Sequence, residues 1–298
     1  MRAALWCTLC ACGAVTDLEV MGPEAVQQEL RSAEPAKPVR RSGFAEEPKL
    51  FRQPVAEAPG AATSVHTTLG LPSAAQVGKL DDWLLTKPQF VVAYDTLHKV
   101  PRWVSWELRS VWLGDAPRTS GFRRDPQLPS SAVQASDSEY TNSGYDRGHM
   151  CPSADRTATS ADNASTFVLT NVVPQTHSSN AGPWAALEDE SRDLAALGKR
   201  LLVIAGPRFG AGHTTIGNGV EVPLATWKVI VVLEPGTTGV TQATRVIAVD
   251  VPNTYSVSGS WRSFRTSVDS IESATGLDLL SDLDPAVEAV VEGRLDTN

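Results

Sequence analysis

The hydrophobic positions of this 298-residue chain separate an amino-terminal part without regular periodicity from a part with short apolar segments, which begins near Gln89. Segments rich in β-branched and aromatic residues are typical of strands, and short continuous apolar runs are typical of buried ones. We therefore predict strands over residues 90–94, 103–108, 166–170, 201–205, 222–233 and 244–251.

Two further segments have the spacing of amphipathic helices. In residues 183–197 the apolar side chains fall on one helical face, and they are Trp184, Leu187, Leu194 and Leu197. Pro183 suits a first helical position and Gly198 a helix end. Residues 263–275 form the second predicted helix, ended by Gly276. Strands and helices mixed along the chain predict an α+β domain, with a central, mainly antiparallel sheet flanked by helices.

The first eighty residues have the composition of a leader and a spacer. Met1 and Arg2 precede an apolar stretch that ends at Ala14, as in a short secretory signal. The residues before Cys12 resemble a bacterial lipoprotein box, which would make Cys12 the site of a lipid anchor. We predict export, as a secreted, periplasmic or lipid-anchored protein. A mitochondrial address is the alternative.

These observations divide the chain into four parts. Residues 1–15 are the predicted export segment, and residues 16–80, rich in Pro, Ala, Glu and Ser, are a predicted flexible spacer. Residues 81–285 are the predicted folded domain, and residues 286–298 are a predicted acidic tail.

The composition is typical of a globular protein, since 42% of residues are hydrophobic and 20% are charged. No apolar run reaches the roughly 18 residues that a membrane span needs. The formal net charge of −8 is unusual for a nucleic-acid-binding protein, but residues 266–298 contain eight acidic residues and one arginine. Arg118, Arg123 and Arg124 are either substrate-groove residues or part of a solvated surface.

The most informative chemistry lies in Asp146-Arg147-Gly148-His149. In an extended segment residues i and i+2 share a face, so Arg147 and His149 can address one ligand together. Arginine binds phosphate through forked hydrogen bonds, and histidine can accept a proton near neutral pH. This pairing favours phosphodiester hydrolysis. Asp146 is assigned no catalytic step and is expected either to fix the local backbone or to orient its neighbours.

The residues around this motif occur in a characteristic order. The blocks that follow are Cys151-Pro152-Ser153-Ala154-Asp155-Arg156, the segment from Thr166 to Gln175 that includes Asn171, Asn180-Ala181-Gly182-Pro183-Trp184, and Leu187-Glu188. In these blocks the sequence resembles the DNA/RNA non-specific endonuclease family, with weaker similarity from about residue 90 to residue 280.

The resemblance implies a ββα-metal nuclease site. It makes His149 the general base, Asn180 the ligand of Mg²⁺ (with Mn²⁺ as a substitute), Glu188 a residue that holds the waters of the ion, and Arg147 the phosphate-binding residue. The implied substrates are DNA and RNA, single- or double-stranded, cleaved to 5′-phosphate ends. A homodimer and an inhibitor protein are partners that the resemblance leaves open.

Several of these residues also have structural interpretations. Without the resemblance, His149 would be interpreted as a buried histidine whose hydrogen bonds are satisfied in the core. Asn180 would be a turn or helix-capping residue, and Glu188 an exposed helix residue. The family commonly has glutamine where this chain has Ala181. Together with the acidic balance, this motivates an alternative function, a catalytically weak exported nucleic-acid-binding protein. Cys151 raises the further alternative of a cysteine hydrolase, for which no oxyanion-hole motif is present.

Overall fold

The structure is a computed structural model that describes residues 64–298. The predicted export segment, the lipid anchor at Cys12 and the spacer up to residue 63 lie outside the described residues. Residues 64–80 already belong to the fold, because His66 in a 3₁₀ turn (Val65–Thr67) and Leu69 are both buried. The folded part therefore starts before the predicted boundary at residue 81. Within residues 64–298, no helix has the length and apolar character that crossing a membrane requires.

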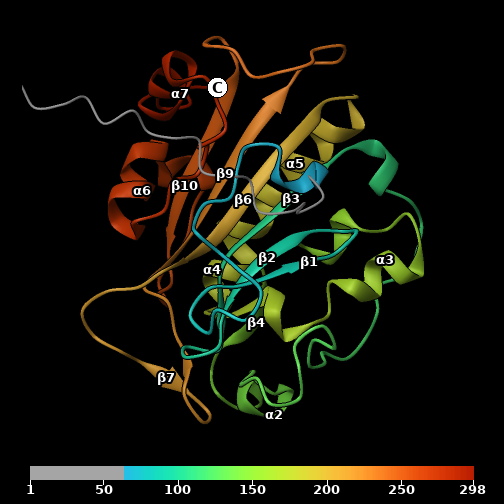
Figure 1. The fold of residues 1–298 in the computed structure, drawn as a ribbon, viewed down its shortest axis with the longest axis vertical. Coiled ribbons are helices and arrows are strands. Elements are labelled where there is room, and N and C mark those ends of the chain that lie inside the picture. Colours follow the sequence, from blue (N-terminus) through green and yellow to red (C-terminus); the bar gives the residue numbers. More distant parts are fainter. Residues whose placement is uncertain (1–63) are drawn as a thin grey trace, which may run out of the picture. The chain divides into compact units, whose positions relative to one another are not determined.

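A seven-stranded sheet forms the centre of this part of the chain (Figure 1). Its order is β1-β2-β3-β6-β9-β10-β11, and every neighbouring pair is antiparallel. The strands are β1 (Trp83–Thr86), β2 (Val91–Asp95), β3 (Val100–Leu108), β6 (Arg200–Arg208), β9 (Ala225–Leu233), β10 (Arg245–Pro252) and β11 (Arg265–Thr266). The predicted α+β class with a mainly antiparallel central sheet is confirmed.

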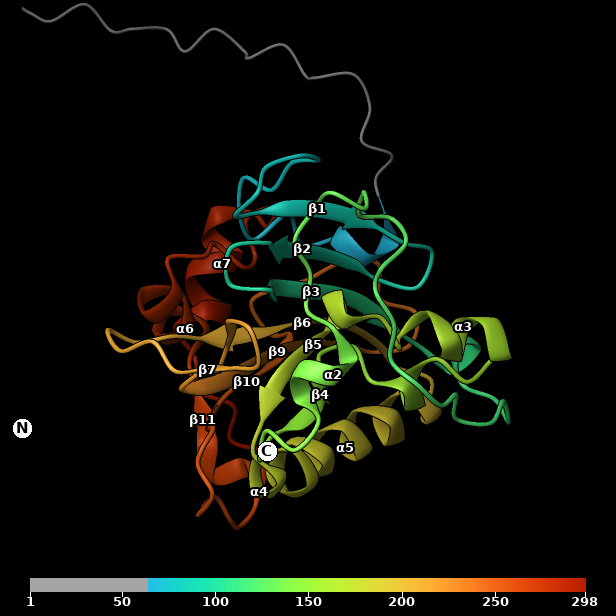
Figure 2. The same ribbon diagram turned by 90° about the horizontal axis from the view of Figure 1, so that it is seen from below.

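The central strands are buried on both faces, which explains why they appear in the sequence as continuous apolar runs. Along β9, Val229 and Val231 belong to one hydrophobic core, whereas Ile230 and Val232 belong to the other. This alternation follows from the two-residue period of a strand. Figure 2 shows helices α6 (Val268–Thr275) and α7 (Pro285–Glu292) on one side of the sheet and helix α5 (Ala185–Ala196) on the other.

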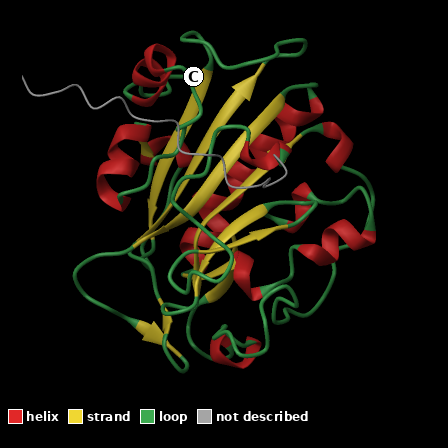
Figure 3. Ribbon diagram, viewed as in Figure 1, coloured by secondary structure: helices red, strands yellow, loops and turns green. Residues whose placement is uncertain are grey.

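Shorter helices and strand pairs surround the central sheet (Figure 3). Two small antiparallel pairs are present, β4 (Asp146–His149) with β5 (Val172–Gln175), and β7 (Thr215–Ile216) with β8 (Val220–Glu221). The remaining helices are α2 (Asp137–Tyr140), α3 (Ser160–Ser165) and α4 (His177–Ser179). Further 3₁₀ turns lie at Ser110–Trp112, Ser153–Asp155, Leu169–Asn171 and Trp261–Phe264.

The structure corrects four further sequence-based expectations. Residues 166–170 form no strand, since a 3₁₀ turn begins at Leu169 and the strand follows as β5. The predicted helix over 263–275 begins only after Ser267, whose side chain caps it, although Gly276 ends it as expected in a left-handed conformation. Pro183 lies in a π-helical turn (Asn180–Trp184) before α5 rather than at the first helical position.

The carboxyl-terminal residues are the fourth correction. Residues 286–298 are not a tail, because α7 contacts α6 and β10 and buries Val291. Asp296 beyond the helix is also buried, and it forms an ion pair with Arg245 of β10, with 2.9 Å between Arg245 Nε and Asp296 Oδ1. The acidic composition of this segment therefore coexists with folded structure.

Candidate active site

The candidate site is built from two short strands and a helix. In the β4–β5 pair, Arg147 lies opposite Pro174 and His149 opposite Val172. The chain then continues through α4 and the π-helical turn into α5. Trp184, at the end of that turn, donates a hydrogen bond from Nε1 to the carbonyl oxygen of His149 at 3.3 Å. This contact joins the start of the helix to the end of β4.

Gly148 is required by the packing of this strand pair. A Cβ atom at position 148 would lie 1.9 Å from Oε1 of Gln175, which crosses over the glycine from β5. Gln175 is fully buried and donates from Nε2 to Thr226 Oγ1 of β9 at 3.0 Å. The glycine of the sequence motif therefore allows the strand pair to lie close against the central sheet.

All four predicted site residues line one cleft with a volume of about 240 Å³. The structure brings Arg147 and His149 of β4 together with Asn180 of the π-helical turn and Glu188 of α5. The other residues that line this cleft are Arg118, Pro152, Ser153, Ala154, Ala181 and Ala185.

His149 lies in the wall of this cleft between two aromatic rings. The ring centroids of Phe122 and Phe167 are each 5.0 Å from that of the imidazole. Its Nε2 atom is buried and has no hydrogen-bond partner within residues 64–298. Burial and the positive charge of Arg118 lower the pKa of His149 to about 3. The imidazole is therefore neutral at physiological pH.

The side-chain amide of Asn180 is oriented by a carboxylate. Asn180 donates from Nδ2 to Asp146 Oδ2 at 3.0 Å, and the same oxygen contacts His177 Nδ1 at 2.9 Å. Because the amide nitrogen is used in this way, the amide oxygen remains for a cation. A neutral oxygen ligand beside a carboxylate suits Mg²⁺, which prefers oxygen ligands and retains most of its waters. The residues present therefore fit the ion that the sequence predicted, and Asp146 has the orienting role expected of it.

Glu188 extends from the first turn of α5 and forms an ion pair with Lys228 of β9, with 3.4 Å between Oε1 and Nζ. Lys228 is 2% exposed and lies between indole rings, 4.0 Å from the Trp184 centroid and 5.7 Å from that of Trp106. Burial raises the pKa of Glu188 and lowers that of Lys228, and the attraction between the two charges opposes both shifts. The lysine thus favours the ionised form of the Glu188 carboxylate, which lines the cleft.

Two arginines supply positive charge to the cleft. Arg147 donates from Nε to Asp137 Oδ1 at 2.5 Å and from Nη2 to Thr141 Oγ1 at 3.1 Å, which uses one side of its guanidinium. Arg118 donates from Nη1 to Ser153 Oγ and lies 5.0 Å from the Phe167 ring.

Arg123 and Arg124, the two other candidates for a substrate groove, do not line the cleft. The backbone of Arg123 forms a bridge with Val168, and the Arg124 guanidinium donates to the carbonyl oxygen of Ala132 at 3.1 Å. Of the three arginines named from the sequence, only Arg118 belongs to the site.

The other polar residues of the motif blocks have structural surroundings. Asn171 is fully buried, accepts from the backbone N–H of Cys151 and donates to its carbonyl oxygen, both at 2.9 Å. Cys151 itself is buried, and burial raises the pKa of its thiol to about 12. A thiol in this state is a poor nucleophile, so the geometry does not favour a cysteine hydrolase.

Comparison with known proteins shows the family of this chain. Residues 75–286 match the family model for DNA/RNA non-specific endonuclease. A relative named Nuclease from Nostoc sp. is 45% identical over 238 residues, which cover 78% of this chain and 86% of that protein. The chain belongs to the DNA/RNA non-specific endonuclease family. This membership supports nuclease activity, and the family is one of metal-dependent nucleases.

More distant members of the endonuclease family include mitochondrial proteins. The mitochondrial nuclease EXOG of Danio rerio is 34% identical over 201 residues, and that of Homo sapiens is 31% identical over 207 residues. The matches cover 57% and 55% of those proteins, so this chain spans just over half of their length. The solved structure titled as the EndoG/EndoGI complex supports the fold, with a TM-score of 0.65 at 24% identity over 76% of this chain and 94% of that one.

Two charged residues of this endonuclease site were not predicted from the sequence. Lys228 is the only charged residue in the apolar strand segment 225–233, and this isolated charge was a usable signal. Asp137, which pairs with Arg147, gave no comparable signal, because it lies in a polar segment before the motif.

Proposed function

We propose that this chain is a Mg²⁺-dependent, sequence-non-specific endonuclease that hydrolyses phosphodiester bonds of DNA and RNA and leaves 5′-phosphate and 3′-hydroxyl ends. The observation that carries the proposal is the shared cleft of His149, Arg147, Asn180 and Glu188 on a β4–β5–α5 unit. A base, a phosphate-binding cation and two oxygen-bearing side chains converge there, which is the set that phosphodiester hydrolysis requires.

His149 is the proposed general base. It removes a proton from the water that attacks phosphorus, and its lowered pKa keeps the imidazole neutral before substrate binds. A phosphate bound in the cleft brings negative charge that offsets the charge of Arg118. This raises the pKa of His149 from its low value in the free enzyme, so that the imidazole becomes a stronger base once substrate is present.

Asn180 is the proposed protein ligand of Mg²⁺, through the amide oxygen that its bond to Asp146 leaves available. Glu188 accepts hydrogen bonds from the waters around the ion, with Lys228 holding its carboxylate in place. When bound, Mg²⁺ supplies positive charge that neutralises the phosphate. Mn²⁺, which also favours oxygen ligands, is proposed as a substitute.

Arg147 and Arg118 are the proposed phosphate contacts. Arg147 is held by Asp137 on one side of its guanidinium, which fixes the direction of the other side. Contacts made to backbone phosphates carry no sequence information, so a site of this kind cleaves without base preference.

We also propose that the protein is exported, because residues 1–14 resemble a secretory signal and because a non-specific nuclease would damage the cell that made it.

The test is cleavage of plasmid DNA and of RNA by the full chain, with Mg²⁺ and with EDTA, followed by analysis of the product ends. We expect metal-dependent cleavage of both substrates and 5′-phosphate products. His149→Asn should lower the rate by at least about 100-fold, which is the lower limit for loss of a general base.

A matched pair of carboxamide variants makes this test specific. Glu188→Gln should slow cleavage, whereas Glu190→Gln on the outer face of the same helix, where Glu190 pairs with Arg262, should not. Folded wild-type protein that binds nucleic acid without cleaving it would instead support the nucleic-acid-binding alternative. Products with 3′-phosphate ends would rule out the mechanism.

A further inference from the structure

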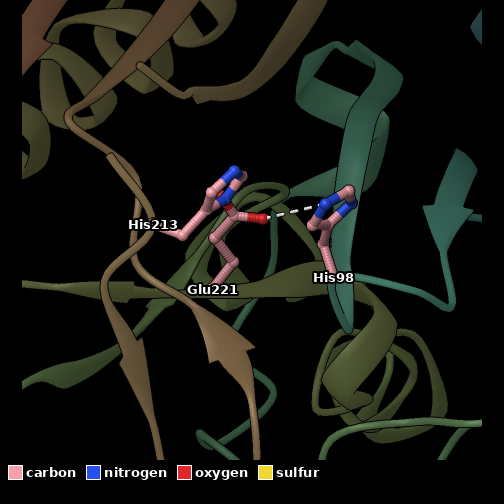
Figure 4. A group of neighbouring side chains, drawn as sticks. All are labelled: His98, His213 and Glu221. Carbon is pink, nitrogen blue, oxygen red and sulfur yellow. Dashed lines mark hydrogen bonds and ion pairs between the residues drawn. The ribbon is translucent and has the colours of Figure 1, made fainter. Parts of the chain in front are cut away.

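A second group of polar side chains lies outside the catalytic cleft, where three separate segments meet (Figure 4). His98 belongs to the turn between β2 and β3, His213 to the loop before β7, and Glu221 to the end of β8. The backbone N–H of Glu221 donates to the carbonyl oxygen of His98 at 3.0 Å, which holds two of these segments together. None of the three residues lines the cleft of His149.

We propose that His98, His213 and Glu221 bind a transition-metal ion, with Zn²⁺ as the ion that best fits the ligands. Each residue offers one ligand atom, and these atoms lie within 4.8 Å of one another. Two histidine nitrogens and one carboxylate oxygen form a common set of zinc ligands. A tetrahedral site with zinc–ligand bonds of about 2.0 to 2.1 Å places ligand atoms about 3.3 to 3.4 Å apart. His98 Nε2 and Glu221 Oε2 are separated by 3.3 Å.

The orientation of His98 supports this assignment. Its Nδ1 lies 2.6 Å from Asp95 Oδ2, and the other oxygen of Asp95 accepts from the backbone N–H groups of Leu97 and His98 at 2.8 and 3.1 Å. The carboxylate therefore favours a proton on Nδ1 and directs Nε2 towards Glu221. Histidines that bind metals commonly have a carboxylate partner of this kind on the second ring nitrogen.

Burial and charge also favour a cation. The side chain of Glu221 is only 4% exposed, and its two oxygens face His98 and His213, with His213 Nδ1 at 2.8 Å from Oε1. A buried carboxylate is stabilised by a cation placed beside it. His213 is 66% exposed and His98 is 43% exposed, so an ion can enter from solvent. The fourth position would be taken by water.

The proposed ion would connect the β2–β3 turn to the loop that contains His213 and to the β7–β8 hairpin. Lys99, next to His98, already donates to the carbonyl oxygen of Asn218 in the turn of that hairpin. The expected role is therefore structural. Zinc should stabilise the fold without entering the reaction at His149.

The test is Zn²⁺ binding by the full chain, with Cys7, Cys10 and Cys12 replaced by serine in every protein so that these thiols cannot bind zinc. Titration calorimetry with ZnCl₂ should give one equivalent in this background. His213→Asn, a change at an exposed position, should weaken binding at least about tenfold, and Asp95→Asn should weaken it by about ten- to 100-fold. His177→Asn is the matched control, because His177 also has a single carboxylate contact through Nδ1 but belongs to no group of three metal-ligating side chains within residues 64–298.

Thermal unfolding gives an independent readout in the same proteins. Zinc at about 100 times the dissociation constant of the serine background should raise Tm by roughly 5 °C in that background and in His177→Asn, and by about half as much or less in His213→Asn. Equal zinc binding and equal Tm shifts in His213→Asn and the serine background would overturn the proposal. So would loss of the zinc equivalent in His177→Asn. Asn180→Ala should keep the zinc equivalent, which separates this site from the proposed Mg²⁺ site.

Discussion

Replacement of Lys228 by methionine tests whether the charge beneath the cleft supports Glu188. The two groups are 3.4 Å apart, which corresponds to an attraction of about 5 kcal/mol at an effective dielectric constant of about 20. Methionine keeps the approximate volume between Trp106 and Trp184 but removes the cation that pairs with the largely buried carboxylate. Breaking a buried pair in this way costs about 3 to 5 kcal/mol. We therefore expect Lys228→Met to lower Tm by roughly 10 °C at pH 8.

The loss should depend on pH in a defined direction. Burial already raises the pKa of Glu188 above its unfolded value of about 4.3, and removal of Lys228 raises it further. A carboxyl group with a raised folded pKa contributes stability that is present at low pH and is lost as pH increases. Lys228→Met should therefore be less destabilising at pH 5 than at pH 8.

Urea unfolding followed by circular dichroism at pH 5 and at pH 8 measures the loss of stability and its dependence on pH. The double variant Lys228→Met/Glu188→Gln should recover most of the stability at pH 8, because it removes the unpaired carboxylate together with the cation. A loss below about 1 kcal/mol for Lys228→Met, or a loss equal at both pH values, would refute the reasoning.

Three further predictions concern individual groups. Arg118→Gln should raise the pKa of His149 above its value of about 3, as observed by NMR titration of the imidazole, and an unchanged pKa would exclude the arginine as a cause. Cys151→Ala should retain nuclease activity, because the buried thiol has its pKa raised to about 12, and a loss matching that of a base variant would restore the cysteine mechanism. Burial and neighbouring carboxylates raise the pKa of Glu292 to about 8, so its contribution to stability is lost as pH rises from its unfolded value towards 8 and above. The Tm of Glu292→Gln should accordingly fall less than that of wild type between pH 5 and pH 9, whereas parallel curves would contradict this.

The sequence predicted the central sheet because its strands are buried on both faces. The largely apolar segments 201–205 and 222–233 bury side chains in two hydrophobic cores. The first lies within β6 and the second contains β9. Strand β5 was missed, since Pro174 lies in its centre and proline disfavours a sheet interior. It is tolerated here because β5 pairs only with β4.

The site residues were predicted by their order along the chain, whereas their environment depends on distant contacts. The pairing of Glu188 with Lys228 spans 40 positions, and that of Lys99 with Asn218 spans 119. Local patterns contain no information on such distances. Helix α7 was missed because the acidic composition of residues 286–298 indicated a tail, although the apolar face of the helix buries Val291.

The most direct test of the proposed mechanism is the Mg²⁺ dependence of plasmid cleavage by wild type, Asn180→Ala and His149→Asn. If Asn180 holds the ion, Asn180→Ala should need at least about tenfold more Mg²⁺ for half-maximal rate. If His149 is the base, His149→Asn should lower the rate at saturating Mg²⁺ by at least about 100-fold while the half-saturating concentration stays the same. Equal Mg²⁺ dependence in Asn180→Ala and wild type, or full activity in His149→Asn, would contradict the proposed roles of these residues.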